Sequence, residues 1–151
     1  MCLPENLYSG ETLIRDKLRS LTGLKWERTP GSGALGAQHN LKGDLYVVNA
    51  DNKYCIEVKS YADDHLTSKY LTGKTPQISE WWTQAKSQAA KVDKIPLLIF
   101  KFDRSKIFVA WGDDPTVYKP ESSVYMYLGR DKIFVALLED WINFYKPTFV
   151  N

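Results

Sequence analysis

Apolar residues recur at helical spacing near the beginning of the sequence. Within residues 11–22, Ile14, Leu18 and Leu21 follow one another at intervals of four and three, so their side chains line one face of a helix. Gly23 comes directly after this stretch and favours the end of a helix. The pattern predicts an amphipathic helix over residues 11–22 whose apolar face packs on a core.

Two later stretches show the same periodicity. Residues 77–92 follow Pro76, a residue favoured at the start of a helix, and residues 136–145 lie near the end of the sequence. The positions expected to face the core are Ile78, Trp82, Ala85, Ala89 and Val92 in the first stretch, and Leu137, Trp141 and Phe144 in the second. We expect a helix over each stretch.

Three pairs of apolar segments have the composition of β-hairpins, in which turn-forming residues separate two short strands. The pairs are residues 41–48 with 54–59, 96–102 with 106–111, and 123–128 with 132–135. The turn of the first pair contains Asn and Asp, which favour tight turns. Helix, strands, helix and strands in this order predict one compact α/β unit, and 151 residues are the length of a single domain.

Two polar stretches lack both periodicities and are predicted to be loops. Residues 29–36 contain three glycines and a proline, a composition that lets backbone amides approach a bound group closely. A plain connector is the alternative for this stretch. Residues 61–75 are charged and irregular, and predict a long loop.

Composition and charge argue against several classes of protein. The chain is 44% hydrophobic and 25% charged, as in globular domains, and has no apolar run of about 18 residues that would span a membrane. Its net charge of +2 is far from that of a nonspecific nucleic-acid coat. Two histidines and two cysteines without ligand spacing argue against zinc, and Cys55 is expected in the core. Without a signal-peptide pattern we expect an intracellular protein, in the host cytoplasm if it is viral.

Candidate chemistry gathers on the first hairpin. Side chains alternate along a strand, so Glu57 and Lys59 project from one face while Ile56 and Val58 project from the other. An ordinary surface ion pair would explain Glu57 and Lys59 alone. The hairpin, however, folds Asp44 back beside Glu57, and two carboxylates next to an ammonium group suit metal-assisted hydrolysis of a phosphodiester.

Magnesium is the cation that this set of side chains favours. It prefers oxygen ligands and keeps several waters, so Asp44 and Glu57 suffice to hold it, and the backbone carbonyl of Val58 offers another oxygen. Lys59 can position the attacking water and offset charge on the phosphate. Glu11 falls on the inward face of the first helix, where capping of the helix N-terminus is the alternative to a role at the site.

The order of these residues resembles the PD-(D/E)XK nuclease superfamily and, more closely, the archaeal-type Holliday junction resolvases. Those enzymes share a helix-borne glutamate, a loop with Arg, Ser and Gly, an aspartate, and then Glu-Val-Lys. The matching residues are Glu11, Arg28, Gly31, Ser32, Gly33, Asp44, Glu57, Val58 and Lys59. The resemblance covers about residues 9–111. It implies a restriction-endonuclease-like core with a central mixed β-sheet flanked by helices, followed by a C-terminal extension over about residues 112–151.

The resemblance also implies roles for individual residues. Asp44 and Glu57 would be metal ligands, Lys59 the catalytic lysine, and Glu11 an auxiliary ligand, with Mn²⁺ able to replace Mg²⁺. Arg28 and Ser32 would approach the DNA phosphates, although a surface arginine and a turn serine are the alternatives. A glutamine on the helix after the lysine strand often lies near such sites, and the candidates are Gln84, Gln77 and Gln88.

Two further inferences concern DNA. One ring of the Trp81–Trp82 pair could stack on unpaired bases, with packing in a core or dimer interface as the alternative. By resemblance the chain is a homodimer that cuts two symmetry-related strands of a four-way junction in recombination or repair, leaving 5′-phosphate and 3′-hydroxyl ends. The alternatives are another nuclease on this fold (restriction-like or nicking), a non-catalytic DNA-binding module, and an unrelated α/β domain.

Overall fold

The computed structural model describes residues 10–30, 43–61, 77–112, 124–128 and 131–151, with residues 124–128 described by their backbone only. These ranges contain four helical elements and seven strands. In chain order they are α1 (Gly10–Thr22), β1 (Trp26–Arg28), β2 (Leu45–Val47), β3 (Tyr54–Tyr61), α4 (Gln77–Lys91), β4 (Ile95–Phe102), β5 (Phe108–Gly112), β6 (Val124–Leu128), β7 (Asp131–Leu137), α5 (Leu138–Asp140) and the π-helix η2 (Trp141–Tyr145).

The seven described strands form one mixed sheet in the order β1-β2-β3-β4-β5-β7-β6. β3 and β4 are parallel, in register from Tyr54↔Ile95 to Tyr61↔Phe102, and the other neighbouring strands are antiparallel. Parallel neighbours need a long crossover, which α4 provides between β3 and β4. The predicted central mixed sheet flanked by helices is therefore confirmed.

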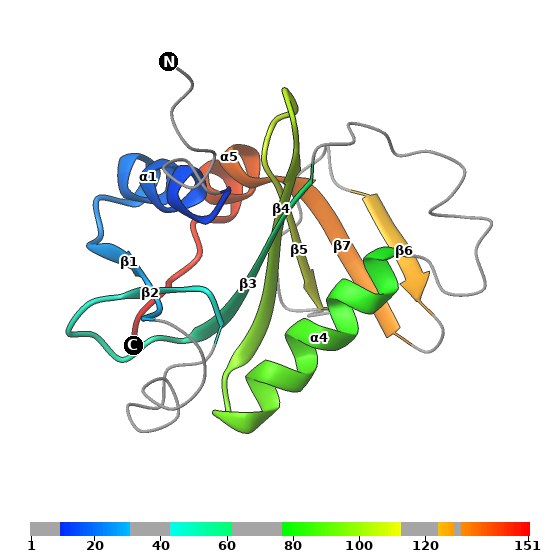
Figure 1. The fold of residues 1–151 in the computed structure, drawn as a ribbon, viewed down its shortest axis with the longest axis horizontal. Helices are drawn as coiled ribbons and strands as arrows, with labels where there is room; N and C mark the ends of the chain where they lie inside the picture. Colours follow the sequence, from blue (N-terminus) through cyan, green and yellow to red (C-terminus); the bar gives the residue numbers. More distant parts are fainter. Residues whose placement is uncertain (1–9, 31–42, 62–76, 113–123, 129–130) are drawn as a thin grey trace, which may run out of the picture.

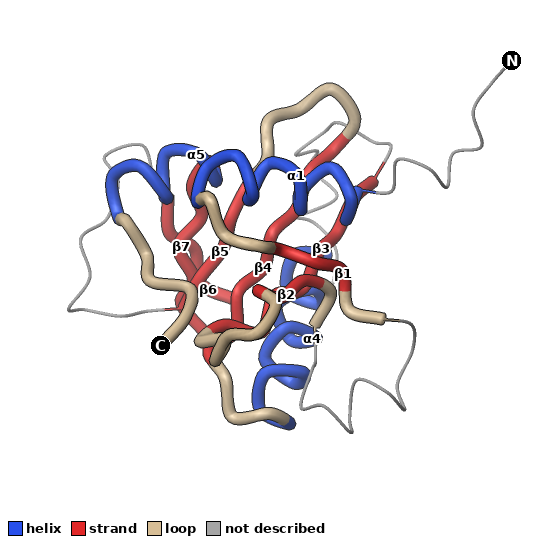
Figure 2. The backbone as a smooth tube through the Cα atoms, turned by 90° about the vertical axis from the view of Figure 1, so that its left-hand side faces the viewer, coloured by secondary structure: helices blue, strands red, loops and turns tan. Residues whose placement is uncertain are grey.

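Helices cover both faces of the sheet, α1 and α5 on one face and α4 on the other (Figures 1 and 2). The α1 face buries a cluster that includes Ile14, Leu18, Ile56 and Val58. The α4 face buries a second cluster, which includes Ile78, Trp81, Trp82, Leu98, Phe100 and Phe102. Each fully buried side chain of this size stabilises the fold by roughly 1.5–3 kcal/mol. The two clusters hold β3 and β4 at the centre of the molecule.

Most predicted elements are confirmed with small shifts of their ends. The two longer helices begin and end within one residue of the prediction, and the three hairpins are present as β2–β3, β4–β5 and β6–β7. Cys55 is buried, as expected. The beginning of the first predicted strand, residues 41–42, lies outside the described residues. So do residues 31–36 of the loop predicted over 29–36 and residues 62–75 of the loop predicted over 61–75.

One prediction about the elements is wrong, and one strand was missed. The closing helix was expected over residues 136–145, but Ala136 and Leu137 belong to β7, where Leu137 pairs with Phe108 of β5. The chain then turns into α5 and the wider π-helix, which buries Ile142 and leaves Phe144 63% exposed. β1 was not predicted at all. It is only three residues long and exists through its pairing with β2.

Residues beyond the predicted core join the same sheet. β7 pairs with β5, and β6 pairs with β7. The last residues return to the turn before β3, where Val150 forms a bridge with Asn52 and the amide of Asn151 donates to the carbonyl of Asp51 at 2.9 Å. This places the C-terminus beside β2 (Figure 1).

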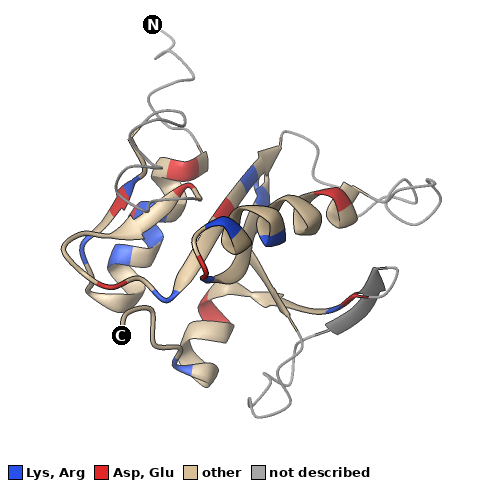
Figure 3. Cartoon of the chain, turned by 90° about the horizontal axis from the view of Figure 1, so that it is seen from below, with Lys and Arg blue, Asp and Glu red and all other residues tan. Residues whose placement is uncertain are grey.

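Charged residues of both signs are interleaved over the described surface (Figure 3). On α1, Arg15, Lys17 and Arg19 alternate with Glu11 and Asp16. Several of these side chains form ion pairs with their neighbours, such as Arg19 with Glu27 at 2.5 Å. Among the described helices, none combines the length and the apolar character that a bilayer crossing requires.

Gly43 is the backbone position on which the geometry of the hairpin depends most. Its φ is +84°, and a Cβ built there would lie 2.5 Å from the carbonyl oxygen of Ile56. We therefore expect Gly43→Ala to lower the free energy of unfolding by about 2–4 kcal/mol, through left-handed backbone strain and this clash.

Gly23 provides a matched control for that measurement. Its φ is +72°, but no atom would lie within 4 Å of an alanine Cβ at this position, so Gly23→Ala carries the backbone strain without the clash. Urea unfolding should show a loss of about 1 kcal/mol for Gly23→Ala. If both variants lost the same free energy of unfolding, the clash with Ile56 would not contribute to the effect of Gly43→Ala.

Candidate active site

Asp44 is held in place by three hydrogen bonds. Its amide donates to the carbonyl of Ile56 at 2.7 Å, and its carbonyl accepts from the amide of Thr29 at 2.9 Å. Its carboxylate oxygen Oδ2 accepts from the amide of Val58 at 2.7 Å. The backbone of Asp44 is thus fixed between β3 and the residue after β1, and its carboxylate lies against the middle of β3.

Glu57 and Lys59 project from β3 toward α4. Their immediate partners on parallel β4 are Leu98 and Phe100, which belong to the cluster beneath α4. Glu57 is only 7% exposed, and its Oε1 lies 3.6 Å from Nζ of Lys59. An ion pair at this distance and depth is more than a surface pair, because little water screens it.

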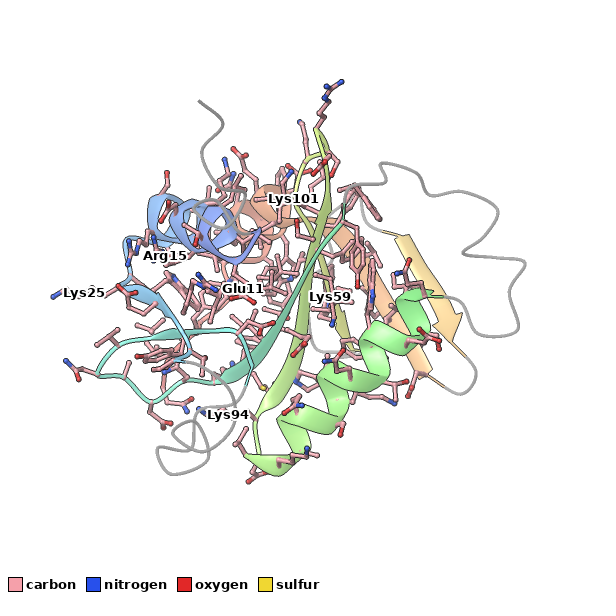
Figure 4. The ribbon with its side chains drawn as sticks, viewed as in Figure 1. Glu11, Arg15, Lys25, Lys59, Lys94 and Lys101 are labelled. Atoms are coloured by element: carbon pink, nitrogen blue, oxygen red, sulfur yellow. The ribbon has the colours of Figure 1, made fainter. Side chains whose placement is uncertain are left out.

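Glu11 reaches the same region from α1. Gly10 packs so closely on Ser60 that a Cβ on Gly10 would lie 2.2 Å from Cβ of Ser60, which brings the first turn of α1 against β3. Glu11 extends from α1 toward β3, while Lys59 belongs to β3 itself (Figure 4). The Oε2 of Glu11 accepts a hydrogen bond from Nε of Arg28 at 2.9 Å. The structure therefore brings five of the predicted residues together, and two ion pairs form among them. The five are Glu11, Arg28, Asp44, Glu57 and Lys59.

Burial raises the pKa of both central carboxyl groups. For Asp44 burial is the largest cause, and it outweighs the hydrogen bond from Val58, which lowers the pKa. For Glu57 burial and the nearby Asp44 raise the pKa from 4.5 to about 7, although Lys59 opposes the rise. The negative charge of Glu11 contributes in the same direction at both groups. Both carboxyl groups are therefore costly to keep charged in the absence of a further cation.

The oxygen atoms at this site suit a divalent cation. Val58 donates its amide toward Asp44, and the carbonyl of a strand residue lies on the same edge as its amide, so the Val58 carbonyl faces the same side. Two carboxylates and one carbonyl suffice for a cation that retains waters. In the described part of the chain, no three Asp, Glu, His or Cys side chains are arranged to enclose a metal by themselves.

A cleft of about 250 Å³ opens beside these groups. It is lined by Gly10, Glu11, Val58, Lys59, Ser60 and Tyr61. Two larger hollows, of about 540 and 460 Å³, lie on the side of α5 and the C-terminal residues, and none of the predicted site residues lines them. Because catalysis depends on the groups in place and not on volume, the smaller cleft, which Glu11 and Lys59 line, is the candidate active site.

The predicted helix glutamines lie on one stripe of α4. Gln77, Gln84 and Gln88 share the side of Trp81, whose ring stacks on Tyr61 of β3. The other side of α4 faces β7, where Lys86 pairs with Asp131. All three glutamines therefore border β3, and Gln84 is exposed. The geometry of α4 therefore does not show which of the three glutamines lies nearest to the active site.

Two expectations about DNA contacts have different outcomes. Trp81 and Trp82 are 4% and 3% exposed, so neither can stack on a base, and core packing is the correct interpretation. Both point inward because Trp81 packs toward β3 and Trp82 toward Gly112 of β5. Ser32 lies outside the described residues.

Sequence reasoning missed Tyr61, which was assigned to a loop. It is the last residue of β3, is 39% exposed, and lines the cleft with Lys59. The alternation that places Glu57 and Lys59 on one face continues to Tyr61, so the signal was present in the sequence.

A pH dependence follows from Glu57. Its pKa is about 7 in the folded protein and 4.5 ordinarily, so the folded state holds the proton more tightly. The stabilisation that comes from this protonated carboxyl group is complete below about pH 4.5 and is lost as the pH rises through about 7. We expect the metal-free protein to lose at most about 3 kcal/mol over this range, and Mg²⁺ to restore stability at pH 8.

Glu57→Gln should remove most of that dependence, because glutamine does not titrate. Glu80→Gln, at an exposed position of α4, serves as the control. Thermal unfolding from pH 4.5 to 8 in EDTA measures the effect. If Glu57→Gln kept the wild-type slope, the burial of this carboxyl group would not be its cause.

Comparison with known proteins identifies the family of this chain. Residues 8–149 match the family model described as "Phage putative PDDEXK endonuclease". Protein D14 of Escherichia phage T5 is 39% identical over 140 residues, which span 89% of this chain and 88% of that protein. Among solved structures, the chain is similar to Archaeoglobus fulgidus Hjc, a Holliday junction resolvase, at 16% identity and a TM-score of 0.40, over 87% of this chain and 88% of that one. This last likeness is too distant to bear on activity.

Proposed function

The chain belongs to the phage PD-(D/E)XK endonuclease family, and we propose that it is a Mg²⁺-dependent DNA endonuclease whose active site is Asp44, Glu57 and Lys59. The observation that carries the proposal is the hydrogen bond from Val58 to Oδ2 of Asp44 at 2.7 Å. It fixes one half-buried carboxylate beside a buried one, Glu57, whose own neighbour is Lys59 at 3.6 Å. Such a set of groups is expensive to bury without a cation to stabilise it.

Each group has a distinct role in this proposal. Asp44, Glu57 and the Val58 carbonyl hold the cation, which when bound polarises the scissile phosphate and favours deprotonation of water. Lys59 positions the attacking water and offsets the charge that develops on the phosphate. The water oxygen bonds to phosphorus and releases a proton to solvent as the bond to the 3′ oxygen breaks, and the 3′ oxygen takes up a proton from solvent. The products are a 5′-phosphate and a 3′-hydroxyl.

Glu11 and Arg28 supply the outer part of the site. Their side chains are 32% and 44% exposed, and an ion pair this exposed stabilises a protein by less than about 1 kcal/mol. The pair therefore separates at little cost when DNA binds. Glu11 then turns to the cation, directly or through water, and Arg28 to a phosphate. Ser32 and Gln84 are further candidates for contacts to DNA.

For the substrate we propose a branched DNA, in particular a four-way junction cut by a homodimer. The order of Glu11, Arg28, Asp44 and Glu57-Val58-Lys59 is that of the archaeal-type resolvases, and a junction with two-fold symmetry needs two active sites. The net charge of +2 is also weak for a protein that binds any duplex by charge alone.

A cleavage assay on two substrates tests this proposal. A synthetic four-way junction and a linear duplex of the same sequence are incubated with protein in Mg²⁺ or in EDTA. Paired Mg²⁺-dependent nicks in the junction alone are expected. Equal cutting of both substrates would keep the nuclease and reject junction selectivity, as for a restriction-like or nicking enzyme. Binding without cleavage in any divalent metal would indicate a non-catalytic DNA-binding module.

A further inference from the structure

Tyr61 is an exposed aromatic residue at the mouth of the cleft. It lies on the same face of β3 as Glu57 and Lys59, two residues beyond Lys59. It is 39% exposed, whereas the Trp81 ring against it is only 4% exposed. Among the described residues, the accessible aromatic surface at this cleft therefore belongs to Tyr61.

The ring of Tyr61 rests on a stack of buried aromatic side chains. Trp81 lies parallel to it, with centroids 5.0 Å apart and planes 19° apart. Trp81 is packed in turn against Phe100 at 5.7 Å and Phe102 at 6.5 Å. The carbonyl of Tyr61 accepts from the amide of Asp103 at 3.0 Å, which secures the end of the strand. One face of the Tyr61 ring is thus occupied by Trp81, and the ring is held in a defined plane.

The position of this ring relates it to the scissile phosphate. Two residues of a strand span about 6.6 Å, so Tyr61 lies within one nucleotide of a phosphate bound at Lys59. Both residues line the same cleft. A base attached next to that phosphate can reach the exposed surface of Tyr61.

We propose that Tyr61 stacks on a nucleobase next to the bond that is cut, and that this base must have an unstacked face. Within a continuous duplex each base is stacked between its two neighbours. A side chain can therefore stack on a base only where the stack of bases is interrupted. A branch point provides such a base. The inference rests on the proposed nuclease function and gives it a source of selectivity for branched DNA.

Fluorescence binding tests this contact apart from catalysis. A forked DNA and a linear duplex each carry 2-aminopurine, at the branch point or at the same sequence position, and are titrated with Lys59→Ala protein in Mg²⁺. The same titrations are made with a double variant, Lys59→Ala with Tyr61→Leu. Leucine still covers Trp81 but has no aromatic face. We expect quenching of 2-aminopurine in the fork to be lost, and affinity for the fork to fall roughly 5- to 150-fold, since stacking on one base accounts for a change of this size.

Two further variants make the result specific. Tyr61→Phe keeps the ring and should retain both quenching and affinity. Phe144→Ala removes a 63% exposed ring from the opposite side of the sheet and should change neither. Tryptophan fluorescence of each variant checks that the core around Trp81 is intact.

The outcomes separate this inference from the function on which it rests. Unchanged quenching and affinity in the Tyr61→Leu variant, while wild-type protein cleaves the same fork, would overturn the role of Tyr61 alone. Equal weakening for fork and linear duplex would also overturn it, because a contact to every DNA is not selective. Failure of wild-type protein to cleave any DNA would reject the proposed function instead.

Discussion

Replacing Lys59 by alanine is expected to slow Mg²⁺-dependent DNA cleavage by about 10²–10³-fold without unfolding the protein or weakening its affinity for Mg²⁺. The ammonium group of Lys59 lies 3.6 Å from Glu57 and lines the cleft. It is the basic side chain that the described site places beside both carboxylates, and its loss leaves the metal ligands in position. Cleavage rates and Mg²⁺ calorimetry on the same preparation measure the two effects separately.

Lys25 offers the control for this prediction. It is an exposed lysine between α1 and β1 and points away from the cleft (Figure 4). Lys25→Ala should cleave DNA at close to the wild-type rate. If Lys59→Ala cleaved as fast as Lys25→Ala, the assignment of Lys59 to the chemistry would be wrong.

Asp44 gives the second large effect, and its two substitutions separate charge from structure. Asp44→Asn is expected to weaken Mg²⁺ binding at least about 100-fold, with a matching loss of cleavage, because a ligand charge is removed. The fold of the metal-free protein should remain as stable or become more stable. An asparagine oxygen can still accept from Val58, and repulsion between Asp44 and Glu57 disappears.

Asp44→Ala should lose cleavage as well, but it also removes the acceptor of the Val58 amide. We expect it to lower the free energy of unfolding by about 1–2 kcal/mol relative to Asp44→Asn. Urea unfolding in EDTA compares the two variants, and calorimetry compares their Mg²⁺ affinity. Wild-type Mg²⁺ affinity in Asp44→Asn would contradict the assignment of Asp44 as a ligand.

The geometry around Asp44, Glu57 and Lys59 could be predicted because it depends on local rules. Strand alternation places Glu57 and Lys59 on one face, and a tight turn returns the hairpin so that Asp44 meets β3. The helix over residues 10–22 follows from periodicity in the same way. The roles of these residues in catalysis remain predictions that the variants above test.

The parts that could not be predicted depend on contacts between distant segments. β1 is too short for its own pattern and forms by pairing with β2. The strand β7 continues through Leu137 because Phe108 is opposite it, which overrides a helical pattern in residues 136–145. The ion pair between Glu11 and Arg28 likewise joins a residue of α1 to a residue of β1. No local sequence pattern indicates that these two elements are in contact.

The tryptophan pair on α4 illustrates a third limit. Neighbouring helical residues point about 100° apart, which predicted one buried and one exposed ring. Both are buried because α4 lies across two different strands, so that one ring faces β3 and the other faces β5. The exposed aromatic group at the site is instead Tyr61, which covers Trp81 from the sheet.

The proposed metal site is best tested by the position of a metal ion in crystals grown with Mn²⁺, located by its anomalous scattering. We predict one ion at about 2.0–2.3 Å from carboxylate oxygens of both Asp44 and Glu57, with the Val58 carbonyl as a further ligand. An ion bound elsewhere, in crystals of protein that cleaves DNA with Mn²⁺ in solution, would contradict the assignment of Asp44 and Glu57 as metal ligands.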